Sequence, residues 1–212
     1  VAGLDGDIVE VETDISPGLP LFAIVGLPDM AVQEAKERVR AAIRNSGFSF
    51  PMKRIVVNLA PADLKKEGPA YDLPMAIAIL ISSEQLAADV SKTVFLGELS
   101  MDGSLRHTNG ILPMVSIAKE RGYSKVVVPN VDAPEAALIG GVNIVPIESL
   151  AQVIACLKDE IAAPEYQAKE VTESTPVFPA TDLAYIKGQE HVKRALEVAA
   201  AGGHNIIMMG PP

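Results

Sequence analysis

Apolar and polar residues change their spacing several times along the first 160 residues, and each change predicts a new element. Apolar residues alternate with Glu and Asp over 7–14, which predicts a half-buried strand. The apolar run 21–25 predicts a second strand, and the Pro/Gly-rich turn before it predicts a hairpin. Over 30–45 apolar side chains recur every three or four residues, so we expect an amphipathic helix with Asp29 as its N-cap.

The alternation of strands and helices continues to residue 158. The segment 73–81 is apolar on nearly every side, which predicts a buried helix. An Asp-Gly turn between short strands at 93–96 and 105–107 predicts a hairpin. Further strands are predicted at 55–59, 125–128 and 143–146, and further helices at 111–121, 134–138 and 149–158. This order of elements predicts an α/β (α+β) fold in which helices pack against a mixed sheet.

The regular spacing is lost between residues 161 and 181, where Pro, Glu, Ser, Thr and Ala dominate. We interpret this segment as a Pro-containing linker between a domain of residues 1–160 and a second segment, 182–212. In that second segment the pattern predicts a helix over 188–201 and a buried strand over 205–209.

Composition and charge limit the classes of function that this chain can have. The formal net charge of −9 argues against a nucleic-acid-binding surface, although four basic residues on the 30–45 helix leave a local DNA contact open as an alternative: Lys36, Arg38, Arg40 and Arg44. The single cysteine, Cys156, indicates a buried thiol in a reducing compartment. No apolar run is long enough to cross a bilayer and no signal peptide is evident, so we expect a cytoplasmic protein without a membrane partner.

The end of the chain resembles the start of a nucleotide-binding module. Many Walker A loops begin with a buried strand followed by Gly-Pro-Pro, yet the Lys, the second Gly and the Ser/Thr of the full motif are missing here. The segment 186–205 resembles the entry to a magnesium-chelatase-type AAA+ ATPase module. This resemblance implies ATP and Mg²⁺ as cofactors of a longer protein and none for this fragment. It also implies a partial ATP-binding set: Ile186, Gly188, Gln189, Gly210, Pro211 and Pro212.

The segment 66–70, Lys-Glu-Gly-Pro-Ala, resembles the loop of Lon-type protease domains that presents a nucleophilic serine at the start of a helix. The segments 95–105 and 109–113 resemble the Lon hairpin and the segment that supplies a lysine base. Aligned in this way, Ala70 occupies the nucleophile position and Pro113 the base position. Neither has a hydroxyl or an amine, so the resemblance predicts no proteolysis and no catalytic residue here.

Other chemically active side chains have simpler interpretations. Ser82 and Ser83 fit the final turn of a helix, although a peptidase with its nucleophile relocated to one of them stays open as an alternative. Lys65 and Lys66 fit solvated loop charges, and His107 fits an isolated residue at the rim of the sheet. Asp72 fits a helix cap, and no spacing of His, Cys, Asp and Glu predicts a metal site.

Nearly the whole chain resembles the YifB/ComM-type magnesium-chelatase-like AAA+ proteins. The residues that carry this resemblance are 14–20, 24–29, 34–39, 58–63 and 72–74. The resemblance implies a Lon-like N-terminal domain followed by an AAA+ core, and a ring, commonly a hexamer, that drives DNA branch migration in natural transformation. We therefore expect this chain to be a fragment whose Lon-like domain is non-proteolytic and has a scaffolding or regulatory role. ATPase activity and DNA binding are expected of the full-length protein.

Overall fold

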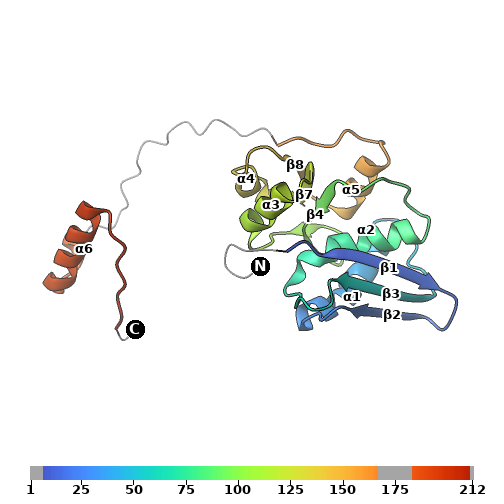
Figure 1. Ribbon diagram of the computed structural model, residues 1–212, viewed down its shortest axis with the longest axis horizontal. Helices are drawn as coiled ribbons and strands as arrows, with labels where there is room; N and C mark the ends of the chain where they lie inside the picture. Colours follow the sequence, from blue (N-terminus) through green and yellow to red (C-terminus); the bar gives the residue numbers. More distant parts are fainter. Residues whose placement is uncertain (1–6, 167–182, 211–212) are drawn as a thin grey trace. The chain divides into compact units, whose positions relative to one another are not determined.

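A computed structural model describes residues 7–166 and 183–210 of the chain. The chain separates into two compact units, residues 1–168 and 169–212. The first unit contains two three-stranded sheets and one two-stranded sheet, with helices packed on them (Figure 1). The predicted mixed α/β class is therefore confirmed, but the strands are divided among small sheets because short helices and loops separate them.

The first sheet has β3 (Arg54–Ala60) at its centre, between β1 (Glu10–Ser16) and β2 (Leu21–Val25). β1 runs antiparallel to β3 and β2 runs parallel to it, so β1 and β2 are not neighbours. The predicted hairpin is therefore wrong. The turn at 17–20 spans two strand spacings, about 10 Å, which four residues can reach. β3 lies between β1 and β2, and it buries Ile55, Val57 and Leu59.

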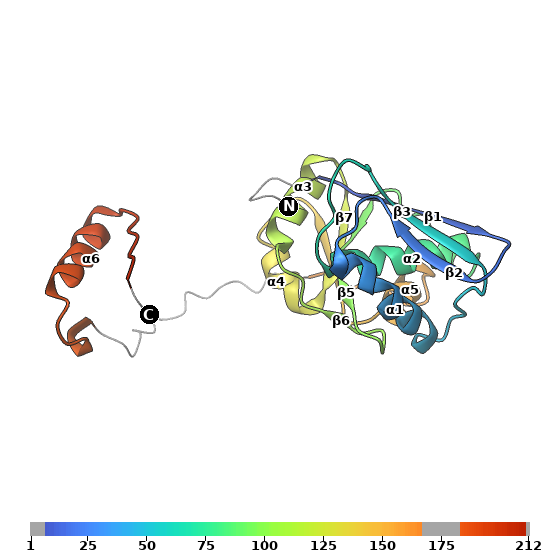
Figure 2. The same cartoon turned by 90° about the horizontal axis from the view of Figure 1, so that it is seen from below.

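Two helices cover the inner face of this sheet (Figure 2). They are α1 (Met30–Asn45) and α2 (Asp72–Ser82). α1 begins where predicted, because the Asp29 side chain accepts a hydrogen bond of 2.8 Å from the Val32 amide. Its buried residues, including Val39 and Ile43, lie on the predicted apolar face and pack against β3 and α2.

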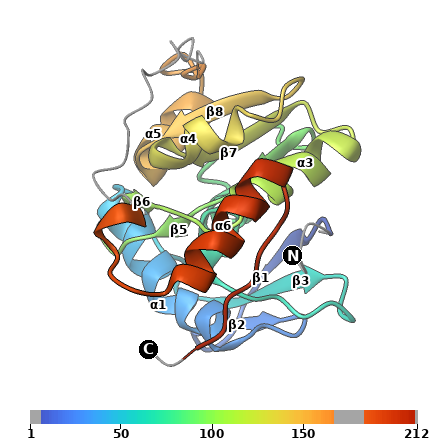
Figure 3. The same ribbon diagram turned by 90° about the vertical axis from the view of Figure 1, so that its left-hand side faces the viewer.

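The second sheet is entirely parallel, in the order β4–β7–β8. Its central strand is buried on both faces, as expected for a parallel sheet. Val126 and Val128 pack with α3 and α4 in one cluster, whereas Val127 packs with α2 and α5 in the other. Figure 3 shows α3 and α4 beside the strands β7 and β8. The elements are β4 (Thr93–Phe95), β7 (Lys125–Pro129), β8 (Asn143–Ile147), α3 (Ile111–Glu120), α4 (Ala133–Ala136) and α5 (Leu150–Leu157).

Short elements join these layers. A hairpin forms around the predicted Asp-Gly turn, with β5 (Glu98–Leu99) antiparallel to β6 (Leu105–Arg106). Its first arm is β5 and not the predicted strand at 93–96, because that strand is β4, which pairs with β7. A 3₁₀ turn, η1 (Pro69–Tyr71), leads directly into α2, and another, η2 (Asn130–Asp132), leads into α4. No helix in residues 7–166 or 183–210 combines the length and apolarity needed to cross a bilayer.

Residues 183–210, the described part of the second unit, form a 3₁₀ turn, η3 (Leu183–Tyr185), and a helix, α6 (Glu190–Gly202). The predicted helix is confirmed, but the predicted buried strand at 205–209 is wrong: this segment pairs with no described strand, and Ile207 is 86% exposed. A strand needs a neighbour to bond its backbone groups, and an apolar sequence alone does not provide one. Most of the predicted linker lies outside the described residues.

Candidate functional site

The loop between β3 and α2 is fastened to the start of α1 by one carboxylate. Asp29 caps α1, and its second oxygen accepts a 3.2 Å hydrogen bond from the Gly68 amide. The Asp29 amide in turn donates to the Lys66 carbonyl at 3.0 Å. The loop that resembles a catalytic segment is therefore held in a fixed place by a local helix cap.

Lys66 is fully buried, which contradicts its interpretation as a solvated charge. Its Nζ donates a hydrogen bond to the Pro61 carbonyl, and its amide donates to the Leu27 carbonyl at 3.1 Å. Lys65, in contrast, is exposed and paired with Glu67 at 2.6 Å, as predicted. The local sequence could not predict that Lys66 is buried, because a buried ammonium group needs an acceptor and only the folded loop brings the Pro61 carbonyl to it.

Ala70 lies in η1, at the entrance to α2, and is only 7% exposed. Its carbonyl accepts a hydrogen bond of 3.2 Å from the Gly97 amide, and the Gly97 carbonyl accepts one of 3.1 Å from Leu73. The position that resembles a nucleophile site is therefore fixed against the segment that follows β4. Pro113 lies in the first turn of α3. That both positions are catalytically silent stays a prediction.

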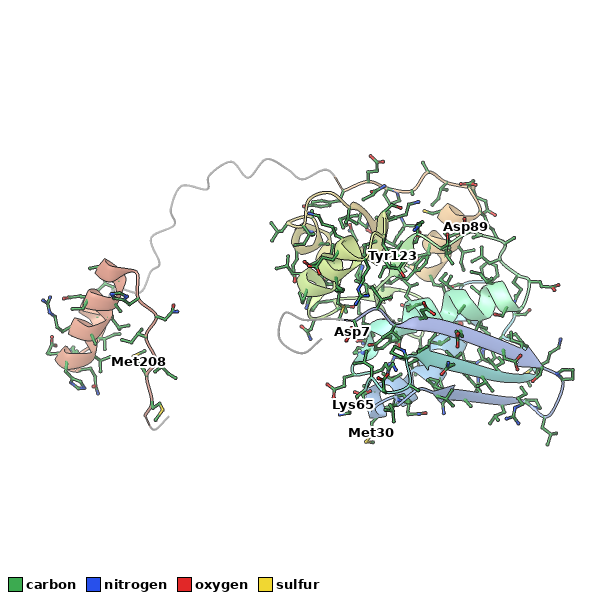
Figure 4. All side chains as sticks on the ribbon, in the orientation of Figure 1. Asp7, Met30, Lys65, Asp89, Tyr123 and Met208 are labelled. Atoms are coloured by element: carbon green, nitrogen blue, oxygen red, sulfur yellow. The ribbon has the colours of Figure 1, made fainter. Side chains whose placement is uncertain are left out.

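A cavity of about 560 Å³ lies beside Ala70, within the range of small-ligand sites. Its walls come from β1, α2, β4 and α3, and Met114, next to Pro113, contributes to it. Asp7, Lys65 and Tyr123, which Figure 4 labels, also line it. Burial, reinforced by Asp29 and Glu67, raises the pKa of the nearby Tyr71 hydroxyl. Sequence reasoning missed this cavity because its walls are distant in the chain.

Asp72 forms a buried ion pair with Arg38, so its interpretation as a helix cap is wrong. The Arg38 Nε and Nη2 atoms lie 2.7 and 3.1 Å from the two Asp72 carboxylate oxygens. Leu99 donates a third hydrogen bond, of 3.2 Å, from its amide. The hydrogen bonds that Arg38 donates to Asp72 raise the pKa of Arg38, whereas burial raises the pKa of Asp72.

Two of the four basic side chains of α1 already have partners within the domain. Arg38 is committed to Asp72, and Arg40 lies 3.1 Å from Glu37 and over the ring of Phe50. These contacts lower the cationic character that a DNA phosphate would meet on this helix.

His107 is not isolated, in contrast to its predicted setting. Its Nδ1 atom is hydrogen-bonded to the buried carboxylate of Asp132, which also accepts a 2.9 Å bond from the Thr108 amide. The hydrogen bond to Asp132 and the negative charge of that carboxylate raise the pKa of His107, and a hydrogen bond to Asn109 adds to the effect. The pair anchors the turn before α3 to η2.

Ser82 and Ser83 occupy the final turn of α2, as predicted. Ser82 Oγ donates to the Thr13 carbonyl at 3.2 Å and Ser83 Oγ donates to the Leu80 carbonyl at 3.2 Å. Among residues 7–166 and 183–210, neither hydroxyl is hydrogen-bonded to a lysine, histidine or carboxylate, which a serine nucleophile needs as its base.

The candidate ATP-binding residues lie in the second unit. Gly188 and Gln189 both have positive φ angles, 76° and 58°, and Gln189 is the N-cap residue of α6. Ile186 is 44% exposed, and Gly210 is also exposed. Pro211 and Pro212 lie outside the described residues. The role of this set stays a prediction.

Comparison with known proteins shows which protein family the chain is similar to. A profile described as "Subunit ChlI of Mg-chelatase" matches residues 11–132, and one described as "Magnesium chelatase, subunit ChlI" matches residues 182–212. The chain is 41% identical to the competence protein ComM of Haemophilus influenzae and 42% identical to the uncharacterised protein YifB of Escherichia coli, in each case over 99% of its length. It spans 42% and 41% of those two proteins.

The likeness to Lon is more distant. The chain is 25% identical to the Lon protease of Mycolicibacterium smegmatis over 168 residues, which is 73% of this chain and 21% of that protease. Together with the mixed α/β architecture, this match supports a Lon-like first unit.

Proposed function

The chain belongs to the YifB/ComM-type magnesium-chelatase-like proteins, and we propose that it comprises the non-proteolytic Lon-like domain of an AAA+ ATPase and the start of its ATPase domain. The observation that carries the proposal is Ala70, which lines the cavity in the nucleophile position and offers no reactive group. A serine in that place would need a neighbouring base, and Pro113 supplies none. The domain would then have a scaffolding or partner-docking role.

The cofactors of the longer protein would be ATP and Mg²⁺. Gly188 and Gln189 have left-handed backbone conformations and form a tight turn at the start of α6. In this position the two residues would contact the adenine base of ATP. Ile186 supplies a partly exposed apolar side chain beside it. Hydrolysis of bound MgATP would drive the longer protein, and the residues proposed here would form only part of its binding site. Gly210 would open the phosphate-binding loop.

The partners of the longer protein would be further copies of itself in a ring, and DNA. The name of the Haemophilus relative, a competence protein, supports a role in natural transformation. We propose ATP-driven branch migration of DNA as that role, with a hexamer as the active form.

The proposal is tested on the longer protein with and without residues 1–160. ATPase turnover with and without DNA, and molar mass by light scattering, should both change when the Lon-like domain is absent. Unchanged hexamers and unchanged DNA-stimulated turnover would contradict a scaffolding role.

The absence of proteolysis has a separate test. A fluorophosphonate probe reacts with activated serines, so we expect no labelling of the 212-residue chain. Labelling that disappears in Ser82→Ala or Ser83→Ala would overturn the proposal and establish a peptidase with a relocated nucleophile.

A further inference from the structure

We propose that the cavity beside Ala70 binds an extended peptide segment of a partner protein, which adds as a strand to the free edge of β4. The segment would be apolar and carry a basic residue. This inference rests on the proposed function in one respect, namely that the site does not cut the peptide that it holds.

The first argument is that β4 is a terminal strand whose open side faces the cavity. Among the described strands, β4 pairs only with β7, and Thr93, Val94 and Phe95 all line the cavity. The Thr93 amide already bonds to the Val90 carbonyl at 3.0 Å, so the groups left for an added strand are the Thr93 carbonyl and the N–H and C=O of Phe95. A peptide carries matching groups at the required spacing, whereas a compact small molecule does not.

The hydrogen bonds around Gly97 show which way the edge points. The Leu96 amide bonds to Val127 in β7, whereas the Gly97 amide bonds to the Ala70 carbonyl on the opposite side. Successive residues of a strand direct their backbone groups to opposite sides, so Phe95 directs its N–H and C=O to the side of Ala70. A guest strand would therefore continue the line of pairing that Ala70 begins.

The side chains around the cavity fit an apolar segment with some polar contact. Ile77 and Ile81 of α2 and Ile117 of α3 contribute apolar surface. On β1, Thr13 lines the cavity, and its Oγ1 atom is buried without a hydrogen-bond partner among the described residues. Because this oxygen is closed off from solvent, polar contact with a ligand would come from other lining side chains, such as Tyr71 and Ser91.

The charges around the cavity select a basic segment. Asp7, Glu10 and Glu67 are acidic, whereas Lys65 is the single basic residue among the lining groups. Lys65 is already paired with Glu67, and Asp7 lies 4.0 Å from Arg121 outside the lining. The remaining negative charge favours Lys or Arg in the bound peptide and disfavours a nucleic acid.

The test begins with random dodecapeptides displayed on phage and selected against the 212-residue chain. We expect enrichment of peptides with alternating apolar residues and at least one Lys or Arg. A selected peptide is then synthesised with a single N-methyl group at each position in turn. Two carbonyl acceptors remain on this edge, those of Thr93 and Phe95, so N-methylation should weaken binding about tenfold or more at two peptide residues spaced two apart and much less at the residue between them.

Two variants locate the site. Ala78 lies on α2 and lines the cavity, so Ala78→Phe should fill it and abolish binding of the selected peptide. Ala41→Phe is the matched control, because Ala41 is a half-buried alanine of α1 outside the lining. In ¹⁵N spectra the Phe95 amide should shift with peptide more than the Leu96 amide, which is already bonded within the sheet.

Several results would overturn the inference. They are a selection that yields no peptide, binding that survives Ala78→Phe, or N-methyl losses without a two-residue period. The fate of the peptide separates this inference from the proposed non-proteolytic function. A bound peptide recovered intact supports both, and a bound peptide that is cleaved refutes only the non-proteolytic function. If no peptide binds and the fluorophosphonate probe labels no serine, only the peptide site is refuted.

Discussion

The guanidinium of Arg38 holds the carboxylate of Asp72 through two hydrogen bonds, of 2.7 and 3.1 Å, and thereby joins α1 to α2. The Asp72 side chain is fully buried and that of Arg38 is 19% exposed. The Leu99 amide bonds to the same carboxylate, so β5 is held at this junction as well. This ion pair fixes the start of α2, two residues after Ala70.

Removing one partner of this pair should destabilise the domain strongly. Arg38→Met or Asp72→Asn leaves an uncompensated buried group, and we expect each to lower the free energy of unfolding by about 3–5 kcal/mol. The double variant Arg38→Met/Asp72→Asn should cost clearly less than the sum of the two single changes, since it buries no charge. Urea unfolding of the four proteins measures this cycle, and additive losses would contradict the pairing.

The pair of His107 and Asp132 should make stability depend on pH. Asp132 raises the pKa of His107 in the folded chain, so this pair contributes fully below the unfolded value of about 6.5. The contribution is lost as the pH rises through the folded pKa. The difference in melting temperature between wild type and His107→Gln should therefore be larger at pH 5.5 than at pH 9, and NMR titration of the imidazole should report the raised pKa. A His107 that titrates at or below 6.5 would contradict this.

Gly26 should tolerate no side chain. Its φ angle is +96°, and a Cβ there would overlap the Leu59 carbonyl oxygen in β3. Gly47 provides a matched control, because its φ is +87° with open space around it. We expect Gly47→Ala to cost about 1 kcal/mol from backbone strain alone. Gly26→Ala should exceed that by at least about 2 kcal/mol of overlap, measured by thermal unfolding. Equal losses would show that the loop moves to accommodate the methyl group.

The two neighbouring lysines of the loop should differ in their effect on stability. Lys66→Ala removes a fully buried stem and the donor to the Pro61 carbonyl, so we expect a loss of at least about 2 kcal/mol. Lys65→Ala removes an exposed pair and should stay within about 0.5 kcal/mol of wild type. Chemical denaturation compares the two, and a loss with Lys65→Ala as large as with Lys66→Ala would contradict the burial.

Elements whose information is local were predictable from the sequence. Asp29 caps α1 as expected, because a cap needs only a side-chain oxygen three residues before the amide that it accepts from. The unbroken apolar run of β7 predicted burial, and the motifs around 58–74 indicated the family that the comparisons support. The chemistry missing from Ala70 and Pro113 is also visible in the sequence, although its consequence is a prediction.

Contacts between distant segments were decided only by the tertiary structure. The insertion of β3 between β1 and β2 replaced a plausible hairpin, because burial of β3 on the inner face outweighs the proximity of its neighbours in sequence. Arg38 and Asp72 are 34 residues apart, and nothing local indicates that they meet. The buried Lys66 and the cavity beside Ala70 arise in the same way. The sequence by itself determined most elements of the first unit and the family, since these depend on residue types and spacing, whereas the absent dyad stays a prediction. The folded chain alone determined which groups are buried together, since packing brings remote residues into one place.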